Sequence, residues 1–439
     1  MSQLKKDEIL YERAKKVLPG GASRNQVLRQ PHPVYAASAS GSYLTDVNGK
    51  QYIDFSANIG SLIHGHAHPK IIEAAYEQMK KGTAYMVATE VEVEYAEYMI
   101  NRIKSFDKIR FLNSGTEAVM HLTKVARAFT GRSKIAKCEG AYHGTYDVIE
   151  VSEKPNPSNW GDKKRPNSVP HTPGVPKGVL DSVVIVPYND LENTINILEA
   201  NKDDLACIII DPMPHRINML PASQEYVNTI YDWTRKNGSL FCFDEVITFR
   251  VHYSGMQECY NVQPDLTSLG KIIGGGFPIG AFGGRNDIME VLDPIGQYYK
   301  YPLSGTFSAN PISLTAGLTA MKLFDQEAVN NLNTLTDKAR SLISEAIKIA
   351  QVPVSMSGDG SIIRLHFSDR VPIDYRENYY NELNQKDAIK RFLDYLYDHG
   401  IICVNSLTFF FNTTMTDKEI NILADTLLDA FKEIKPYFK

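Results

Sequence analysis

The chain has 439 residues, 43% of them hydrophobic, which is enough for two or three domains with buried cores. Its 47 basic and 51 acidic residues give a net charge of −4 without any cationic block, which argues against nucleic-acid or membrane-surface binding. The five cysteines lack CxxC spacing and no stretch approaches the roughly 18 apolar residues of a membrane span, so we expect no metal site, no disulfide framework and no membrane partner. A soluble, cytoplasmic protein with a small-molecule partner is predicted.

The N-terminal segment, residues 1–64, is predicted to form part of a small domain. Residues 4–18, beginning at Leu4, predict a short amphipathic helix that the Pro-Gly-Gly run at 19–21 ends. The alternating stretch 35–55 predicts a hairpin, because its Asn-Gly pair suits the positive φ values of a tight turn.

Residues 65–309 show helices alternating with short apolar runs. The run 69–82 predicts a helix that starts at a proline and stops at a glycine. Segment 223–238, with a capping serine and a terminal glycine, predicts the crossover helix of a βαβ unit. Four runs are too short for helices and lack alternation, which predicts strands buried on both faces, at 134–138, 182–188, 206–213 and 239–246. We therefore predict that residues 65–309 form a large α/β domain with a mostly parallel sheet.

Residues 310–439 are predicted to form a small α+β domain. A long helical stretch is followed by a strand-like run, a helix near 386–399, a second apolar run and a terminal helix. The segment 152–178 is rich in proline, glycine and asparagine, which predicts one long functional loop.

The stretch Asn113-Ser114-Gly115-Thr116 follows an apolar run and opens a helix. A helix N-terminus offers free N–H groups to a phosphate, small residues allow close approach, and the two hydroxyls add donors. Serine and threonine are also common helix caps, so taken alone the stretch fits an ordinary capped helix better.

Two further stretches carry candidate chemistry. Asp244 and Glu245 end a predicted strand, where ligands bind in open α/β sheets, although an acidic residue there is often only a cap or loop residue. Lys271 stands alone in an apolar, glycine-rich run. Burial lowers a lysine pKa and frees the amine for nucleophilic attack, whereas the alternative is a lysine that reaches solvent from a strand edge.

Together these motifs resemble the class III aminotransferases of pyridoxal-phosphate (PLP) fold type I, most closely the branch with glutamate-1-semialdehyde aminomutase and the β-amino acid aminotransferases. The likeness spans nearly the whole chain and includes GHAHP (65–69), NSGTEA (113–118), EGAYHG (139–144), FDEV (243–246), residues 264–284 and SGTFSANP (304–311). It implies a seven-stranded, mostly parallel sheet sandwiched by helices in a PLP-binding large domain, with a small α+β domain built from both termini.

The resemblance also implies residue roles. Lys271 would hold PLP as a Schiff base and shuttle a proton, while Asp244 would pair with the pyridinium nitrogen, which keeps the ring an electron sink. Thr306 would reach the phosphate of the neighbouring subunit, so that an obligate homodimer shares its active sites. The other implied cofactor-binding residues are Ser114, Gly115 and Thr116 around the phosphate, Tyr142 and Val246 on the two ring faces, and His143 nearby.

Three departures from the aminomutase bear on the reaction. Arg216 stands where the aminomutase has asparagine near a cofactor oxygen. It could bind a substrate carboxylate, perturb that oxygen or face solvent. The stretch 244–251 is one residue shorter than the corresponding stretch of the aminomutase. Leu407, or a neighbour, falls where the aminomutase keeps an acidic gating residue, which favours a transaminase and suggests an apolar pocket wall or plain core.

Arg24 lies in the region where this branch carries a carboxylate-binding arginine, although a surface arginine is the alternative. Tyr85 falls where the family lines the cleft. We therefore predict a PLP-dependent aminotransferase that moves an amino group from a β-amino acid or related amine to a keto acid by ping-pong chemistry. The alternatives are an aminomutase, racemase or epimerase on the same scaffold. A non-catalytic relative is disfavoured, because the lysine, the aspartate and the phosphate-binding stretch are all retained.

Overall fold

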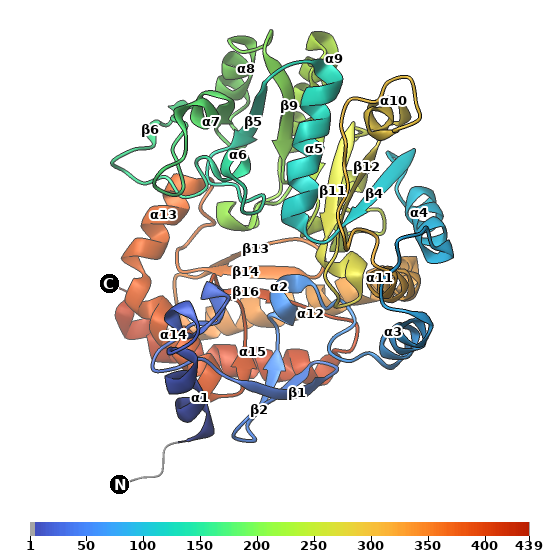
Figure 1. The fold of residues 1–439 in the computed structure, drawn as a ribbon. Coiled ribbons are helices and arrows are strands. Elements are labelled where there is room, and N and C mark those ends of the chain that lie inside the picture. Colours follow the sequence, from blue (N-terminus) through green and yellow to red (C-terminus); the bar gives the residue numbers. More distant parts are fainter. Residues whose placement is uncertain (1–4, 439) are drawn as a thin grey trace.

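A seven-stranded sheet forms the centre of the upper half of the molecule (Figure 1), and the computed structural model describes residues 5–438. The strand order is β4-β12-β11-β10-β9-β5-β8, and only β12 runs antiparallel to its neighbours. The strands are β4 (Lys108–Leu112), β5 (Lys134–Cys138), β8 (Val183–Val186), β9 (Leu205–Ile210), β10 (Leu240–Asp244), β11 (Leu266–Gly270) and β12 (Gly280–Gly284). The four predicted strands and the mostly parallel α/β sheet are confirmed.

Helices cover both faces of this sheet. Alternate side chains of a strand point to opposite faces, so a strand that is buried throughout must be covered twice. Ile208 of β9 packs in the apolar cluster that includes α9 (Gln224–Asn237). The next residue, Ile209, packs in the cluster that includes α5 (Gly115–Thr130). The remaining helices around the sheet include α8 (Leu191–Glu199) and the short α6 (Asp147–Glu150), α7 (Lys177–Asp181) and α10 (Asn286–Met289).

The crossover helix α9 forms as the sequence predicts. The Ser223 hydroxyl accepts a hydrogen bond from the Tyr226 N–H at 3.1 Å, which satisfies one of the free donors of the first turn. Gly238 ends the helix with φ +64°, a left-handed conformation that favours glycine. The helix predicted at 69–82 is α3 (Pro69–Lys81).

The N-terminal and C-terminal segments of the chain both contribute to the lower half of the molecule in Figure 1. One sheet has the order β1-β2-β3-β15, so that a strand after residue 400 pairs in parallel with β3. The predicted turn at Asn48-Gly49 joins β2 to β3, with Gly49 at φ +89°. The bounds are β1 (Ala36–Ser40), β2 (Tyr43–Asp46), β3 (Gln51–Asp54), β15 (Ile401–Ile402), and, in the other sheet, β13 (Ser355–Ser357), β14 (Ile362–His366) and β16 (Thr408–Phe410).

Four helices accompany these small sheets: α12 (Gln326–Ala350), α13 (Tyr375–Asn384), α14 (Lys386–Asp398) and α15 (Asp417–Ile434). The boundaries at 64/65 and 309/310 stay predictions. Beyond the second of them, α11 (Pro311–Leu323) packs against α3 and α4 (Glu90–Arg102), helices that precede the large sheet in sequence.

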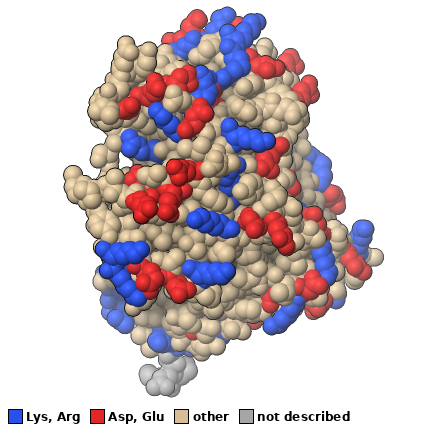
Figure 2. Space-filling model, turned by 90° about the vertical axis from the view of Figure 1, so that its right-hand side faces the viewer, with Lys and Arg blue, Asp and Glu red and all other residues tan. Residues whose placement is uncertain are grey.

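Two predicted segments differ from the structure in extent. The N-terminal helix is α1 (Lys6–Ala14), shorter than 4–18, and Leu4 lies outside the described residues. The segment 152–178 is largely loop, but it also contains a two-stranded ribbon of β6 (Gly161–Asp162) and β7 (Arg165–Pro166). The face of the molecule in Figure 2 mixes Lys and Arg with Asp and Glu side chains. Within residues 5–438, no helix is long and apolar enough to cross a membrane.

Candidate active site

A cavity of about 350 Å³ opens at the carboxyl ends of the parallel strands, which is the usual binding position in open α/β sheets. Strands β9 and β10, the start of α5, the turn after β11 and the short α2 (Ala57–Gly60) all contribute to it. The lining residues are Asn58, Ser61, Asn113, Ser114, Gly115, Thr116, Tyr142, His143, Gly144, Asp211, Asp244, Val246, Ile247, Lys271 and residues 276–279.

The first turn of α5 forms one wall of this cavity. Ser114 caps the helix by accepting a hydrogen bond from the Glu117 N–H at 3.1 Å, and the Thr116 hydroxyl accepts one from the Thr145 N–H at 3.2 Å. A Cβ at Gly115 would lie 2.9 Å from a methyl group of Val246, so glycine allows the helix to approach the segment that follows β10. The N–H groups of this turn have no acceptor within the helix, and they suit an anion.

Asp244 is held at the end of β10 by three donors. Its Oδ2 lies 2.7 Å from Nδ1 of His143, and its Oδ1 accepts hydrogen bonds from the Ser268 hydroxyl at 3.0 Å and the Val246 N–H at 3.1 Å. Burial lowers the pKa of His143 although Asp244 opposes this, so we assign a neutral ring that donates its Nδ1–H to the carboxylate. The buried Nε2 has no partner among residues 5–438.

Lys271 begins a 3-10 turn, η6 (Lys271–Gly274), directly after β11. Its φ of +51° is left-handed, an unfavourable conformation for a residue with a Cβ that occurs mainly at functional sites. Burial lowers the pKa of Lys271, and this outweighs the opposing charges of Asp244 and Asp211. A larger share of the amine is therefore neutral and able to act as a nucleophile or base.

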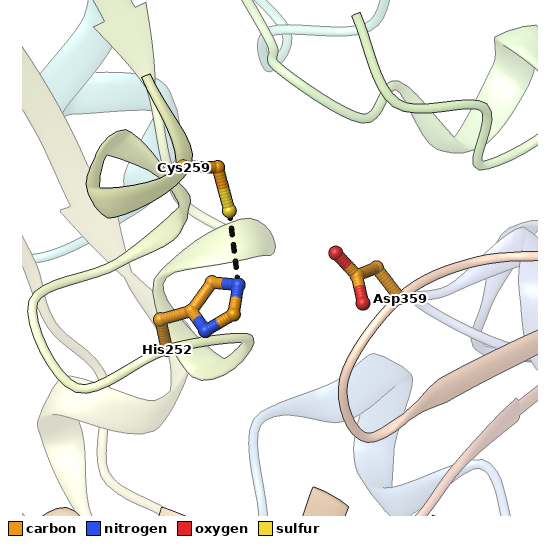
Figure 3. Close-up of side chains that lie close together, drawn as sticks. All are labelled: His252, Cys259 and Asp359. Atoms are coloured by element: carbon orange, nitrogen blue, oxygen red, sulfur yellow. Dashed lines mark hydrogen bonds between the residues drawn. The ribbon is translucent and has the colours of Figure 1, made fainter. Parts of the chain in front are cut away.

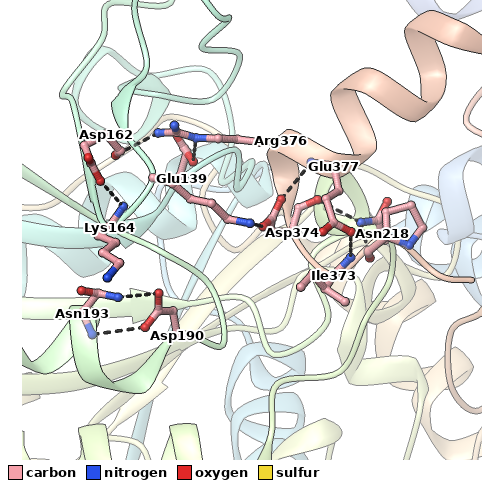
Figure 4. A network of polar contacts seen from close by, with 12 residues as sticks. Glu139, Asp162, Lys164, Asp190, Asn193, Asn218, Ile373, Asp374, Arg376 and Glu377 are labelled. Carbon is pink, nitrogen blue, oxygen red and sulfur yellow. Dashed lines mark hydrogen bonds and ion pairs between the residues drawn. The ribbon is translucent and has the colours of Figure 1, made fainter.

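The loop that carries Tyr142 is anchored by a buried ion pair. Arg376 of α13 contacts both carboxylate oxygens of Glu139, each at 2.9 Å, and also donates to the Gly161 carbonyl at 2.8 Å (Figure 4). Glu139 directly follows β5 and precedes Tyr142 by three residues. The C-terminal part of the chain thus fixes one side of the cavity.

Arg216 lies behind Tyr142 and is absent from the cavity lining. Its guanidinium carbon is 5.8 Å from the centroid of the Tyr142 ring, and its Nη2 forms a 2.9 Å ion pair with the buried Glu153. The charge is therefore already compensated within the protein. The predicted contact of Arg216 with a substrate carboxylate stays a prediction that this geometry does not favour.

Arg24 stands at the mouth of the cavity. Its side chain is exposed, and Nη1 donates a 2.7 Å hydrogen bond to Oδ1 of Asn58, a lining residue. Its positive charge also contributes to the lowered pKa of Lys271, after burial. Within residues 5–438 the Arg24 guanidinium forms no ion pair, so its positive charge stands uncompensated beside a residue that lines the cavity.

Three other predicted residues lie away from the cavity lining. Tyr85 is 44% exposed and donates its hydroxyl to the Lys81 carbonyl at 2.7 Å. Thr306 is exposed in the loop before α11. Leu407 is buried in the core and borders a separate cavity beside Arg364. Their roles stay predictions.

The sequence analysis did not identify Asp211, Asn58 or Ser61 as lining residues. Asp211 follows β9, next to Asp244 on the neighbouring strand, and burial together with the Asp244 charge raises its pKa well above the usual range. Its position at the end of a buried strand was a usable signal. The positions of Asn58 and Ser61 could not be predicted from the sequence. The backbone there is left-handed at Asn58 (φ +50°) and Ile59 (φ +56°), and no sequence pattern indicates such a turn.

Comparison with known proteins identifies relatives over nearly the whole chain. The family model for class-III aminotransferases matches residues 25–431. The glutamate-1-semialdehyde 2,1-aminomutase of Methanothermobacter thermautotrophicus is 39% identical over 402 residues, covering 90% of each chain. An omega-transaminase from Sphaerobacter thermophilus is 39% identical with a TM-score of 0.95, covering 99% of this chain and 98% of that one. A beta-phenylalanine aminotransferase from Variovorax paradoxus is 27% identical with a TM-score of 0.84, covering 96% and 93%.

Proposed function

The chain belongs to the class III aminotransferases, a PLP-dependent family, and we propose that it transfers an amino group from a β-amino acid or related amine to a keto acid by ping-pong chemistry. The observation that carries the substrate assignment is the exposed Arg24 guanidinium beside Asn58 at the cavity mouth. A planar guanidinium binds a carboxylate through two parallel hydrogen bonds, and within residues 5–438 the Arg24 guanidinium forms no ion pair and donates only to Asn58.

The residues of the cavity fit PLP. Ser114, Gly115 and Thr116 would hold the phosphate at the start of α5, where free N–H groups and the helix dipole favour an anion. Asp244, fixed by its three donors, would face the pyridine nitrogen. Tyr142 and Val246, both lining residues, would contact the ring. When bound, PLP supplies an electron sink for the carbanion that forms at the substrate carbon.

Side chains of the protein would transfer the proton and orient the cofactor and the substrate. We propose that Lys271 would hold the cofactor covalently and that its Nζ would accept and return the proton at the substrate carbon, a role for which its lowered pKa suits it. His143 orients the Asp244 carboxylate through its Nδ1–H, and Asp244 would stabilise a proton on the cofactor nitrogen. Arg24 orients the substrate carboxylate.

A homodimer with shared active sites is the second part of the proposal. Several large apolar side chains are exposed around Thr306, which a second copy of the chain would bury: Ile295 (96%), Tyr298 (56%) and Phe307 (59%). Thr306, exposed in the same segment, would then reach the partner's phosphate site.

An aminomutase remains the second candidate, because relatives of that name are up to 39% identical over most of the chain. Against it, Leu407 is an apolar core residue where we expected the aminomutase to carry a gating acid. An isomerase converts its substrate without an external acceptor, whereas a transaminase consumes one equivalent of keto acid for each amine.

The test is a stoichiometric assay with the PLP-loaded enzyme. A β-amino acid such as β-phenylalanine is supplied with and without pyruvate or 2-oxoglutarate, and alanine or glutamate is measured. We expect product only with an acceptor, in a one-to-one ratio. Conversion of glutamate 1-semialdehyde at the same rate without any acceptor would establish the mutase instead.

A further inference from the structure

Three potential metal ligands lie close together on two separate segments of the chain (Figure 3). Cys259 Sγ lies 3.0 Å from His252 Nε2, and the ligand atoms of His252, Cys259 and Asp359 all lie within 4.8 Å of one another. None of these residues lines the Lys271 cavity. We propose that they form a binding site for a divalent transition metal of the zinc type, separate from the PLP chemistry.

The donor set matches this class of ion. Thiolate, imidazole and carboxylate are the three ligand types that Zn²⁺ accepts, while Mg²⁺ and Ca²⁺ prefer oxygen ligands. A tetrahedral zinc site needs ligand atoms about 3.3–3.6 Å apart, given metal–ligand bonds of about 2.0–2.3 Å. Ligand atoms now up to 4.8 Å apart would therefore have to move closer by about 1.2–1.5 Å at most, while the 3.0 Å separation of Sγ and Nε2 would have to lengthen slightly. Three protein ligands leave the fourth position to water, and the exposure of Cys259 gives the ion a path of entry.

The segment that carries His252 and Cys259 is rigidly held. It follows β10 and includes the 3-10 turn η5 (Met256–Cys259). The buried Glu245 accepts hydrogen bonds from the Met256 N–H at 2.5 Å and the Gln257 N–H at 3.1 Å. Glu245 thus fixes the turn that ends at Cys259, so Cys259 needs little ordering when a metal binds.

The turn that carries Asp359 lies against the same segment. It joins β13 to β14 between two glycines with positive φ, Gly358 (+100°) and Gly360 (+50°). A Cβ at Gly360 would lie 2.9 Å from the Val251 carbonyl oxygen, so glycine allows the turn to approach the residue next to His252. A bound ion would therefore join the segment after β10 of the large sheet to the β13–β14 turn of a small sheet.

Cys259 and His252 are already in hydrogen-bonding contact, and the Asp359 carboxylate lies close to both. A metal ion would compensate Asp359 and displace the thiol proton. This site could not be predicted from the sequence, because its ligands come from two segments far apart in the chain and show no CxxC spacing.

The test uses untagged, PLP-loaded full-length protein that has been dialysed against a chelator and then titrated with Co²⁺. We expect one Co²⁺ per chain, with a thiolate-to-cobalt charge-transfer band and ligand-field bands in the red, where the cofactor does not absorb. The other cysteines, Cys138, Cys207, Cys242 and Cys403, are buried, so a thiolate band reports Cys259. Zn²⁺ should displace Co²⁺ and abolish the colour.

The variants Cys259→Ser, His252→Gln and Asp359→Asn should each weaken Co²⁺ binding at least about 10-fold, and Cys259→Ser should remove the thiolate band. His399→Gln, which changes an exposed histidine outside the cluster, is the matched control and should bind as the wild type does. Absence of a thiolate band in the wild type, its survival in Cys259→Ser, or equal losses in His399→Gln would overturn the site.

A second measurement does not depend on any variant folding. Iodoacetamide should alkylate Cys259 in the wild-type protein, and saturating Zn²⁺ should slow this at least about 10-fold, as measured by peptide mass spectrometry. Zn²⁺ should also raise the Tm by about 2 °C or more, since it binds only the folded state. An alkylation rate unchanged by Zn²⁺ would show that Cys259 and His252 form only a hydrogen-bonded pair.

Discussion

The residues predicted to hold the cofactor and those predicted to meet the substrate behave differently in the structure. Eight of the nine residues in the predicted cofactor set line one cavity (Ser114, Gly115, Thr116, Tyr142, His143, Asp244, Val246 and Lys271), and the ninth, Thr306, does not. Of the substrate set (Arg24, Tyr85, Arg216 and Leu407), only Arg24 stands at that cavity, through Asn58. Strand ends and helix starts therefore bring the predicted cofactor residues to one cavity, whereas the predicted substrate residues come from other parts of the fold and mostly lie elsewhere.

Lys271→Ala is the variant with the largest expected effect, because it removes the reactive amine from the cofactor set. We expect a loss of at least about 10⁴-fold in kcat/KM for every donor, as for other residues that carry the chemistry. The visible band of lysine-bound PLP should disappear as well. Lys177→Ala, which changes an exposed lysine, is the control and should retain both. A Lys271→Ala enzyme that keeps its band would show that another lysine binds PLP.

Arg376→Ala tests the support behind the cofactor set. It would leave the buried Glu139 carboxylate without its partner, which costs about 3–5 kcal/mol in comparable pairs. The urea midpoint of the first unfolding transition should fall accordingly. Arg370→Ala breaks a 2.8 Å pair with Glu377 nearby, but that pair is solvent-exposed, so a much smaller shift is expected. Equal shifts would mean that Arg376 does not anchor the Tyr142 loop.

Most of the fold was predictable, because its signals are local. Caps, end glycines and apolar runs identify α9, α3 and the buried strands without reference to the rest of the chain. The same holds for Lys271 and Asp244, whose side chains stand out from apolar surroundings. The metal-ligand cluster and the Glu139–Arg376 pair were not predictable, since each joins segments that only the tertiary fold brings together.

Arg216 shows the limit of reasoning from a single motif. Its position in the sequence allowed a substrate contact, but the structure pairs it with Glu153 at 2.9 Å. Glu153 lies in the long loop predicted at 152–178, where the sequence contains several charged residues and no pattern that selects one partner. A charged side chain can be assigned to a ligand only after the charges around it are known.

Arg24→Ala sharpens the comparison on the substrate side. Loss of a bidentate contact costs about 1.5–3 kcal/mol, or roughly a ten- to hundred-fold fall in kcat/KM for β-amino acids. 1-Phenylethylamine has no carboxylate, so its kcat/KM should change little. Arg24→Lys keeps the charge without the planar geometry of the guanidinium, so its kcat/KM for β-amino acids should lie between those of the wild type and Arg24→Ala. Equal losses for both donors would indicate damage to folding or assembly instead of a lost substrate contact.

Thr306→Ala is expected to have the smallest effect, and it tests whether the one cofactor residue outside the cavity acts across a dimer. Removing one hydrogen bond of about 0.5–1.5 kcal/mol should weaken PLP binding by roughly 2- to 12-fold.

Mixed dimers of a Lys271→Ala chain and a Thr306→Ala chain decide which subunit's site Thr306 serves. If Thr306 serves the partner, the site that keeps Lys271 receives a wild-type Thr306, so its PLP affinity should match the wild type. If Thr306 serves its own chain, that site carries the Thr306→Ala change and should bind PLP as weakly as the Thr306→Ala homodimer. Purifying the mixed dimer through two different affinity tags and titrating it with PLP separates these outcomes, because only the site with Lys271 develops the visible band.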